Sequence, residues 1–506
     1  MADDSSLIPP VPTLARPAPV SADAPPLPVW ARTLDVVSTL LLALVPIVYL
    51  FGGFRGRVFG IRLAFTEPER LLAWAAVALV LRHYFVPQRP LWTILSNRAH
   101  AIVRAREWRT AALALVATRP AILLVGYLAV FLIGYPPRQP AWRISDNEFV
   151  NLQARWDAGW YYGIATDGYY FSPGRDERGE QQNIVFFPAY PLLMRFAGRL
   201  LGANSPPAIF FGGTLVSWCA FTLALVYLFR FARDLLGDDD RAATAVWLVA
   251  TYPFAVWFGA TYTESLYLLG AIASLYHFEH GQLGKAGVWG FLVGLTRPNG
   301  AFLSIPLALL ALRPWLPVWL SGGRPPSGTV EVRRSTPPIS AAVRPLLAAS
   351  LPGVAVLTYS AYIWQLTNNP LSWAEGHAAW GRSYQGLWVL VVERYQYLTE
   401  SGLYAYTSQL PDDLMHVLGV LFVLIPVWPV ARRFGLAYAV FILVNILPPL
   451  AAGGVLSAGR FSSVLFPAFV WAASTINASH RPAWLSAFMA VQALNAILFY
   501  TWREMF

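Results

Sequence analysis

The strongest constraint on the fold of this chain is a series of apolar runs, each about 20 residues long, which is roughly the length that spans a bilayer core. The runs extend from Thr33 to Trp502 with short polar breaks, and 56% of the 506 residues are hydrophobic whereas 13% are charged. A membrane β-barrel would alternate apolar and polar residues, and these runs do not. We therefore expect an all-α polytopic membrane protein.

The apolar runs predict about 13 transmembrane helices, with boundaries uncertain by several residues. The candidate spans lie at about residues 33–53, 70–86, 120–136, 206–236, 242–257, 263–280, 286–297, 300–318, 345–366, 412–430, 435–450, 462–478 and 483–501. Length alone would favour several soluble domains, but the continuity of the runs favours one membrane domain.

The positive charges predict how the helices are oriented. The net charge is +10, and the arginines lie in the polar breaks rather than in one patch, so we expect no nucleic-acid partner. The breaks 87–119 and 319–344 are rich in arginine and should be cytoplasmic. The loops 137–205 and 367–411 then fall on the non-cytoplasmic side.

The chain divides into three predicted parts. Residues 1–30 contain eight prolines and little apolar content, which predicts a disordered cytoplasmic tail and not a signal peptide. Residues 31–118 form an N-terminal extension with two extra transmembrane helices and a basic cytoplasmic segment. Residues 119–506 form the main membrane domain. Cys219 is the single cysteine, which excludes an intrachain disulfide and a cysteine metal cluster.

The loop 137–205 contains the sequence Arg155-Trp156-Asp157 just outside a hydrophobic helix. Apolar side chains recur at helical spacing after it, which predicts a short amphipathic helix with Asp157 near its start, where the helix dipole favours a carboxylate. Asp157 is therefore a candidate catalytic group. The alternative is that Asp157 only caps the helix, with its aromatic neighbours forming an interfacial belt.

Two arginines are expected near the same outer face. Pro298 disfavours helix at Arg297 and cannot donate a backbone bond, so two short helices should meet at 296–300. Arg460, in 457–461, begins another span from the outer side. An arginine at membrane depth costs roughly 2.5 to 3.5 kcal/mol on insertion scales, so a carboxylate or phosphate partner is expected. Snorkelling to the interface is the alternative.

Glu264 opens a span from the outside and is a further candidate, although it also suits a capping position. The loop 367–411 contributes His377 and Trp380 among many aromatics, which suit either sugar rings or an interfacial belt. Nucleotide-binding and metal-ligand motifs are not apparent. We therefore expect neither a cofactor nor a metal.

Taken together, Arg155–Tyr169, Phe186–Pro191, Tyr262–Leu266, Arg297–Gly300 and Gly459–Phe461 resemble the GPI mannosyltransferase II family and its prokaryotic relatives, within the type C glycosyltransferases. The resemblance covers about residues 119–478. It implies a multispan enzyme that takes a hexose, usually mannose, from a polyprenyl phosphate sugar and attaches it to a lipid or glycan acceptor. The active site would face the non-cytoplasmic side of the cell membrane, which is the plasma membrane in a prokaryote.

The family motif places the catalytic base at Asp157. We hypothesise that Arg297 and Arg460 bind the donor phosphate, and that the acceptor or sugar contacts Arg155, Trp156, Tyr161, Glu264, His377 and Trp380. Direct displacement predicts inversion at the anomeric carbon. A lipid or sugar transporter remains a competing interpretation, because many spans and a proline-broken helix pair also suit substrate sites in transporters. A polymerase or ligase of lipid-linked glycans is a third.

Overall fold

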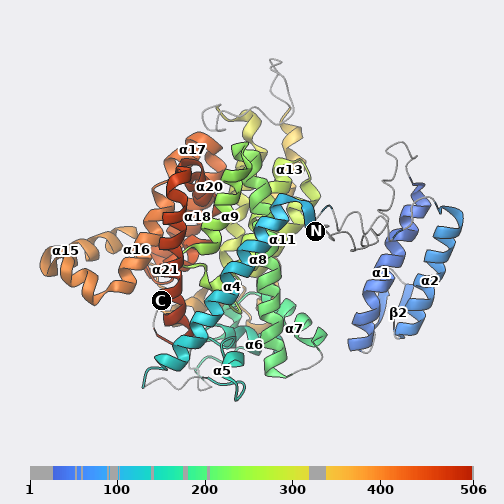
Figure 1. Ribbon diagram of the computed structural model, residues 1–506, viewed down its shortest axis with the longest axis horizontal. Coiled ribbons are helices and arrows are strands. Elements are labelled where there is room, and N and C mark those ends of the chain that lie inside the picture. Colours follow the sequence, from blue (N-terminus) through green and yellow to red (C-terminus); the bar gives the residue numbers. More distant parts are fainter. Residues whose placement is uncertain are drawn as a thin grey trace, which may run out of the picture. The chain divides into compact units, whose positions relative to one another are not determined.

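The computed structural model describes residues 27–51, 54–58, 61–65, 67–87, 91, 101, 103–137, 142–174, 180–201, 205–317 and 338–503. It contains two compact units, Met1–Arg98 and Ala99–Phe506 (Figure 1). A disordered tail was predicted over residues 1–30. Residues 1–26 of it lie outside the described residues. Much of the predicted basic break 319–344 also lies outside them.

The first unit pairs two helices with a hairpin. Helices α1 (Val29–Phe51) and α2 (Pro68–Phe85) pack together, and β1 (Phe54–Val58) and β2 (Ile61–Phe65) form an antiparallel pair. The Nε atom of Arg82 donates to Oδ1 of Asp35 at 2.7 Å, which neutralises a buried guanidinium. The hairpin corrects the all-α expectation for this unit, because aromatic and β-branched residues between the two apolar runs favour strands.

All regular elements among the described residues of the second unit are helices. Its first half comprises α4 (Arg106–Leu132), α5 (Glu148–Asn151), α6 (Ala158–Asp167), η1 (Asn183–Val185), α7 (Ala189–Leu200), α8 (Pro206–Leu236), α9 (Asp239–Thr251), η2 (Ala255–Phe258), α10 (Glu264–Glu279), α11 (Leu283–Thr296), η3 (Pro298–Leu303), α12 (Ser304–Ala311) and η4 (Arg313–Trp315). Its second half comprises η6 (Ile339–Ala342), α13 (Val343–Thr367), α14 (Ser372–Glu375), η7 (Gly376–Trp380), α15 (Leu387–Gln409), α16 (Pro411–Leu424), α17 (Val427–Phe434), α18 (Leu436–Gly453), α19 (Ala458–Ser463), α20 (Phe466–Thr475), η8 (Ala478–His480) and α21 (Arg481–Tyr500).

Six helical segments among the described residues are long and apolar enough to cross a membrane. They are Arg106–Leu132, Pro206–Leu236, Ile339–Thr367, Pro411–Phe434, Leu436–Gly453 and Ala478–Tyr500. Several other predicted spans are helices of fewer residues, so the number of about 13 is not confirmed. The polytopic helical character of the main domain is confirmed.

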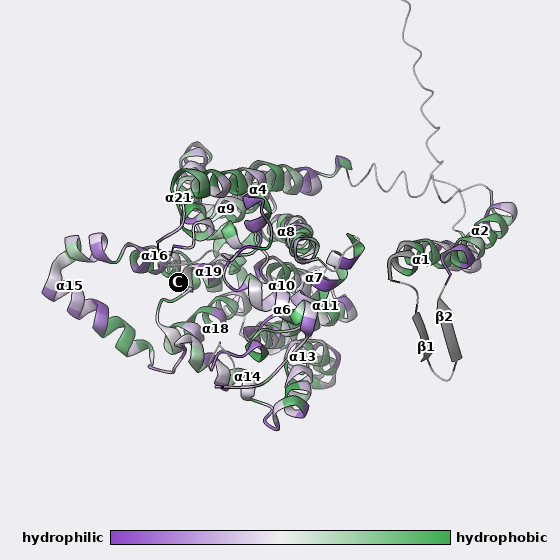
Figure 2. Ribbon diagram, turned by 90° about the horizontal axis from the view of Figure 1, so that it is seen from below, coloured by the Kyte–Doolittle hydropathy of each residue, from purple (hydrophilic) through white to green (hydrophobic). Residues whose placement is uncertain are grey.

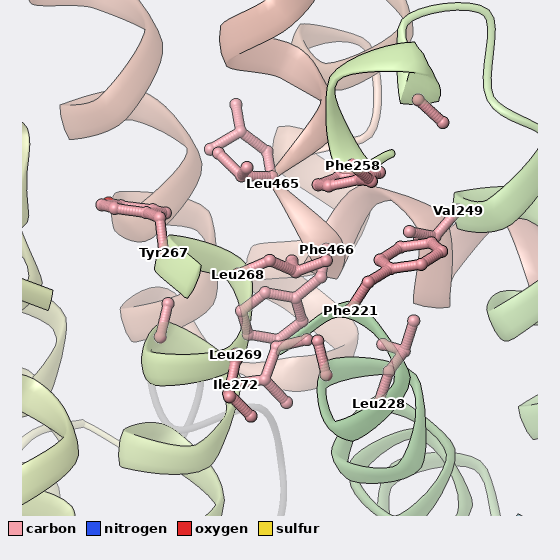
Figure 3. Close-up of a cluster of buried hydrophobic side chains, with 14 of the residues drawn as sticks. Phe221, Leu228, Val249, Phe258, Tyr267, Leu268, Leu269, Ile272, Leu465 and Phe466 are labelled. Carbon is pink, nitrogen blue, oxygen red and sulfur yellow. The ribbon is translucent and has the colours of Figure 1, made fainter. Parts of the chain in front are cut away.

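Helix α10 lies at the centre of the second unit. It packs against α8 and α11, and its side chains from Glu264 to Leu275 are all buried. Figure 3 shows Leu268, Leu269 and Ile272 of α10 among aromatic rings from neighbouring elements, including Phe221 of α8 and Phe466 of α20. A helix that is apolar on all sides belongs in a core. The first residue of this core helix, however, is a glutamate.

The predicted helix break at Arg297 is confirmed. Helix α11 ends at Thr296, Arg297 is extended, and η3 and α12 continue from Pro298. A Cβ atom on Gly300 would lie 2.2 Å from the carbonyl oxygen of Val293, so only glycine fits where the chain turns back on α11. The break therefore presents Arg297 at a fixed position between two helices.

The predicted polar break 87–119 is too long, because helix α4 already begins at Arg106 and contains Arg119. The guanidinium of Arg119 is completely buried. Its nitrogens donate to the backbone oxygens of Ala250, at 2.7 Å, and Ala255, and to Oγ1 of Thr118 at 3.1 Å. The carbonyls at the end of α9 and the start of η2 thus accept the hydrogen bonds of a buried guanidinium that was predicted to lie in a cytoplasmic loop.

Helix α15 departs from the packing of the other helices. It projects away from the remainder of its unit and carries both apolar and polar side chains along its length (Figures 1 and 2). The predicted loop 367–411 is thus largely helical, with α14, η7 and α15 replacing irregular backbone.

Close packing of α7 on α8 generates a stability prediction. A Cβ atom on Gly212 of α8 would lie 2.3 Å from the backbone nitrogen of Gly198 in α7. We expect Gly212→Ala to lower the free energy of unfolding by about 1 to 3 kcal/mol, because the helices must separate. Thermal unfolding of the detergent-solubilised protein measures it. Gly284→Ala, at an exposed helical site with open space around it, is the matched control and should be neutral or stabilising.

Candidate active site

Four charged side chains from separate parts of the sequence meet at the start of α10. The Nη1 atom of Arg460 donates to Oδ2 of Asp157 at 3.1 Å, and its Nε lies 3.0 Å from Oε1 of Glu264. The Nη2 atom of Arg297 donates to the same Glu264 oxygen. One carboxylate oxygen therefore bridges two guanidinium groups, and Asp157 ends the chain of ion pairs.

Burial is greatest at Glu264 and decreases outward from it along these ion pairs. The exposed fraction of the side chain is 0% for Glu264, 8% for Arg297, 14% for Arg460 and 25% for Asp157. Burial alone would lower the pKa of Arg460, but the carboxylates of Glu264 and Asp157 outweigh it and raise that pKa above its usual value. Asp157 is thus the most accessible acid of the network.

The backbone before α6 positions Asp157. Trp156 has a φ of 50°, a left-handed conformation that is rare for a bulky residue. The amide of Asp157 donates to the hydroxyl of Tyr262 at 3.0 Å. Among the described residues, its carboxylate binds Arg460 and not the amides of the first turn of α6, so the side chain forms an ion pair and does not cap the helix.

Thr263 and Glu264 together hold Arg297. The Nε atom of Arg297 donates to Oγ1 of Thr263 at 2.7 Å, beside the bond from Nη2 to Glu264. Asn299 follows in the break, and its amide donates to Oδ1 of Asn445 in α18 at 3.0 Å. The ends of α10 and α11 are therefore fixed to each other and to α18.

A third arginine at this site was missed by the sequence analysis. Arg382 follows η7, and its Nη2 donates to the backbone oxygen of Leu456 at 3.0 Å. Its guanidinium carbon lies 5.3 Å from the centroid of the Phe461 ring. One feature of the sequence could have identified Arg382. It lies in the loop 367–411, which was expected on the non-cytoplasmic side, and the positive-inside rule disfavours arginine there.

Aromatic side chains from both predicted outer loops meet beside the ion pairs. The ring of Trp160 stacks on Phe186 with centroids 5.7 Å apart, and Trp380 contacts both rings at 5.5 and 5.8 Å. Tyr161 connects this cluster to Tyr262. Burial, followed by the charges of Asp157 and Glu264, raises the pKa of Tyr161, so the phenol stays protonated.

His377 lies near the same cluster in η7. Burial, followed by the charge of Arg382, lowers the pKa of His377 to about 4. The imidazole is therefore neutral at ordinary pH and can donate or accept a hydrogen bond without adding charge.

Arg155 and Trp156 bind backbone oxygens and a tyrosine hydroxyl, and Arg155 makes no ion pair with a carboxylate among the described residues. Arg155 donates to the backbone oxygen of Tyr500 at 2.9 Å and to the hydroxyl of Tyr135 at 3.0 Å, and it also bonds two nearby carbonyls. The indole nitrogen of Trp156 donates to the backbone oxygen of Phe499 at 3.2 Å. These contacts attach the loop to α21 and lend no support to the predicted sugar contacts, which remain predictions.

The described residues offer no group of three or more His, Cys, Asp or Glu side chains placed to hold a metal ion. The two carboxylates of the site are instead bound to arginines. The arrangement can bind an anion, accept a proton at Asp157, and stack apolar faces on Trp160, Phe186 and Trp380.

The family model described as mannosyltransferase (PIG-V) matches residues 141–307, about a third of the chain. The matched stretch contains Asp157, Glu264 and Arg297, and ends before Arg382 and Arg460. The resemblance to GPI mannosyltransferases that the motifs predicted is confirmed over this stretch. The match supports a membrane glycosyltransferase. No curated protein matches the chain.

Solved structures of the oligosaccharyltransferase from Archaeoglobus fulgidus are similar to the chain. The apo form has a TM-score of 0.36 at 12% identity, covering 76% of this chain and 56% of that one. The complex with zinc and sulfate has a TM-score of 0.36 at 15% identity, covering 75% and 53%. The form tethered to an acceptor peptide has a TM-score of 0.34 at 12% identity, covering 77% and 55%. The chain thus spans about half the length of those proteins.

The shared oxygen of Glu264 generates a test of the network. We expect Glu264→Gln to lower the free energy of unfolding by about 3 to 5 kcal/mol, because two poorly exposed guanidinium groups lose their common carboxylate. The double variant Glu264→Gln with Arg297→Gln should be more stable than Glu264→Gln alone, since it removes one of the unpaired charges. Chemical or thermal unfolding of Glu264→Gln, Arg297→Gln and the double variant, each compared with the original protein, measures the coupling. Arg106→Gln, which breaks exposed pairs with Asp239 and Asp240, should cost at most about 1 kcal/mol.

The lowered pKa of His377 generates a pH prediction. The unfolded chain binds a proton at this imidazole near the ordinary pKa of 6.5, whereas the folded protein does so only near about 4. The contribution of His377 to stability is therefore complete above pH 6.5 and is lost as the pH falls toward 4. We expect the melting temperature of His377→Gln to fall less than that of the original protein between pH 6.5 and 4. If the melting temperatures of His377→Gln and of the original protein fell equally between pH 6.5 and 4, the imidazole would not titrate in this range.

Proposed function

We propose that the chain transfers a hexose, with mannose as the sugar of the matching family, from a polyprenyl phosphate sugar to a lipid or glycan acceptor on the non-cytoplasmic face of the membrane. The observation that carries the proposal is the meeting of Asp157 with Arg460, Glu264 and Arg297 at the start of α10. The match to mannosyltransferases over residues 141–307 supports the same chemistry.

Asp157 is the proposed base. The hydroxyl of the acceptor gives its proton to the carboxylate as its oxygen attacks the anomeric carbon. The bond from that carbon to the phosphate oxygen breaks, and the phosphate leaves with the bonding electrons. Arg460 binds Asp157 through Oδ2, so we assign Oδ1 to the proton transfer. A single displacement of this kind inverts the anomeric carbon.

Arg297 and Arg460 are the proposed binding groups for the donor phosphate. A polyprenyl phosphate is a good leaving group because its charge is spread over several oxygens, so cations placed in advance contribute more than an acid would. Nη1 of Arg297 is buried with no hydrogen-bond partner among the described residues, which leaves a donor for an anion. Glu264 holds both guanidinium groups in position through one oxygen.

The aromatic cluster is the proposed sugar contact. Trp160, Phe186 and Trp380 present partly exposed ring faces beside Tyr161, and the apolar faces of a hexose stack on such rings. Glu264 is completely buried, which favours a role through Arg297 and Arg460 over direct contact with the acceptor.

A transporter is the second candidate, favoured by the broken helix pair at Arg297. A transporter moves its substrate without making a glycosidic bond. Purified protein supplied with a labelled polyprenyl phosphate mannose and a membrane lipid extract would distinguish the two. Label in a new lipid or glycan supports transfer, whereas label that stays on the polyprenyl phosphate opposes it. The size of the labelled product tests the polymerase or ligase interpretation.

Asp157→Asn tests the proposed base. We expect sugar transfer to fall about 10²- to 10⁴-fold while the melting temperature changes little, because the amide keeps the shape of the carboxylate but is a much weaker base. Asp167→Asn, at the other end of α6, is the control and should retain transfer, since Asp167 is bonded to Thr166 away from the ion pairs. Near-normal transfer by Asp157→Asn in a folded protein would contradict the assignment.

A further inference from the structure

Three guanidinium groups surround one aromatic ring beside the proposed base. The guanidinium carbons of Arg382, Arg460 and Arg297 lie 5.3, 5.7 and 5.9 Å from the centroid of Phe461. Arginine stacks favourably on aromatic faces, so the ring holds the three cations close together. They come from the break after α11, from the segment after η7, and from α19.

The carboxylates at this site are fewer than the arginines. Glu264 pairs with Arg297 and Arg460, and Asp157 pairs with Arg460. Arg382 makes no ion pair with a carboxylate among the described residues, and its Nη1 is buried with no hydrogen-bond partner there. Three cations and two anions leave one positive charge without a counter-ion.

Arg382 is held in place by its other contacts. Its Nη2 donates to the carbonyl of Leu456, and a Cβ atom on Gly453 would lie 2.5 Å from its Nη1, so the guanidinium fits against a glycine. Burial, followed by the charge of Arg460, lowers the pKa of Arg382 to about 10, which still leaves the group charged at neutral pH. A fixed, partly buried cation with an unused donor is suited to an anionic ligand.

A neighbouring cavity limits where such an anion can lie. It has a volume of about 300 Å³ and is lined partly by Gly381, Gly453 and Leu456, next to Arg382. Glu393, Asp412, Asp413 and Arg394 also line it. Arg394 is paired with Asp413, so Glu393 and Asp412 leave the lining with an excess of negative charge that would repel a phosphate. An anion bound by Arg382 would therefore lie toward Arg460, whose guanidinium shares the Phe461 ring, rather than deeper in this cavity.

We propose that Arg382, together with Arg460, binds the phosphate of the polyprenyl phosphate sugar; this inference rests on the function proposed above. The phosphate diester of the donor carries one negative charge, which matches the surplus positive charge of the cluster. When the sugar is transferred, the phosphate leaves as a monoester with greater negative charge, and the third arginine stabilises it. Arg382 thereby becomes a binding residue for the donor and the leaving group.

Binding of a polyprenyl phosphate to the purified full-length protein in lipid nanodiscs tests the inference. We expect Arg382→Ala to weaken this binding about 10- to 100-fold, because one charge-assisted contact is lost. Arg382→Lys should have an intermediate effect, since it retains charge without the guanidinium fork. The uncharged polyprenol should bind equally to the original protein and to both variants. Thermal unfolding of each variant shows whether it is folded.

Arg432→Ala is the matched control. Arg432 also lies over an aromatic ring, 5.1 Å from the centroid of Trp428, but belongs to α17 and not to the site. It should bind the polyprenyl phosphate as the original protein does. Equal affinity of folded Arg382→Ala and Arg432→Ala would overturn the inference.

The two proposals fail in different ways. If the protein binds a polyprenyl phosphate through Arg382 but transfers no sugar to any acceptor, the anion site stands and the proposed function fails. If sugar transfer occurs but Arg382→Ala leaves both the donor KM and kcat unchanged, the function stands and the role of Arg382 fails. If sugar transfer occurs and Arg382→Ala raises the KM for the donor, both the proposed function and the role of Arg382 are supported.

Discussion

The ion pairs of Glu264 determine how the central elements of the second unit meet. A fully buried carboxylate requires cations, and its Oε1 supplies the partner for both Arg297 and Arg460. These arginines fix the break after α11 and the short helix α19 against the first turn of α10. Because the middle of α10 is enclosed by apolar side chains, its carboxylates lie at its two ends: Glu264 belongs to this site, and Glu279 at the other end pairs with Arg313.

Local chemistry made part of this arrangement predictable. Pro298 cannot donate a backbone bond, and that restriction alone predicts the end of α11 at the preceding arginine. The high cost of arginine at membrane depth likewise predicts a partner for Arg297 and Arg460. The sequence does not indicate which carboxylate would pair with Arg297 and which with Arg460, because the paired residues are 33 to 303 positions apart along the chain.

Other features depend entirely on tertiary contacts. Arg119 resembles a loop arginine in sequence, and its burial is possible only because carbonyls of Ala250 and Ala255 reach it from another helix. Arg382 also resembles a loop arginine in sequence, since its proximity to Phe461 arises from contact of the segment after η7 with Leu456, before α19. The strands β1 and β2 were missed because they occupy a short gap between two apolar runs.

The excess of arginine around Phe461 has a consequence for turnover. On the proposed chemistry, the product polyprenyl phosphate is more negatively charged than the substrate from which it forms, so the same cations hold it more firmly. Departure of the spent lipid would then be slower than departure of an unreacted donor, and accumulated carrier lipid would occupy the enzyme. On that chemistry, the rate of sugar transfer would follow how quickly the membrane clears and recharges its lipid carriers.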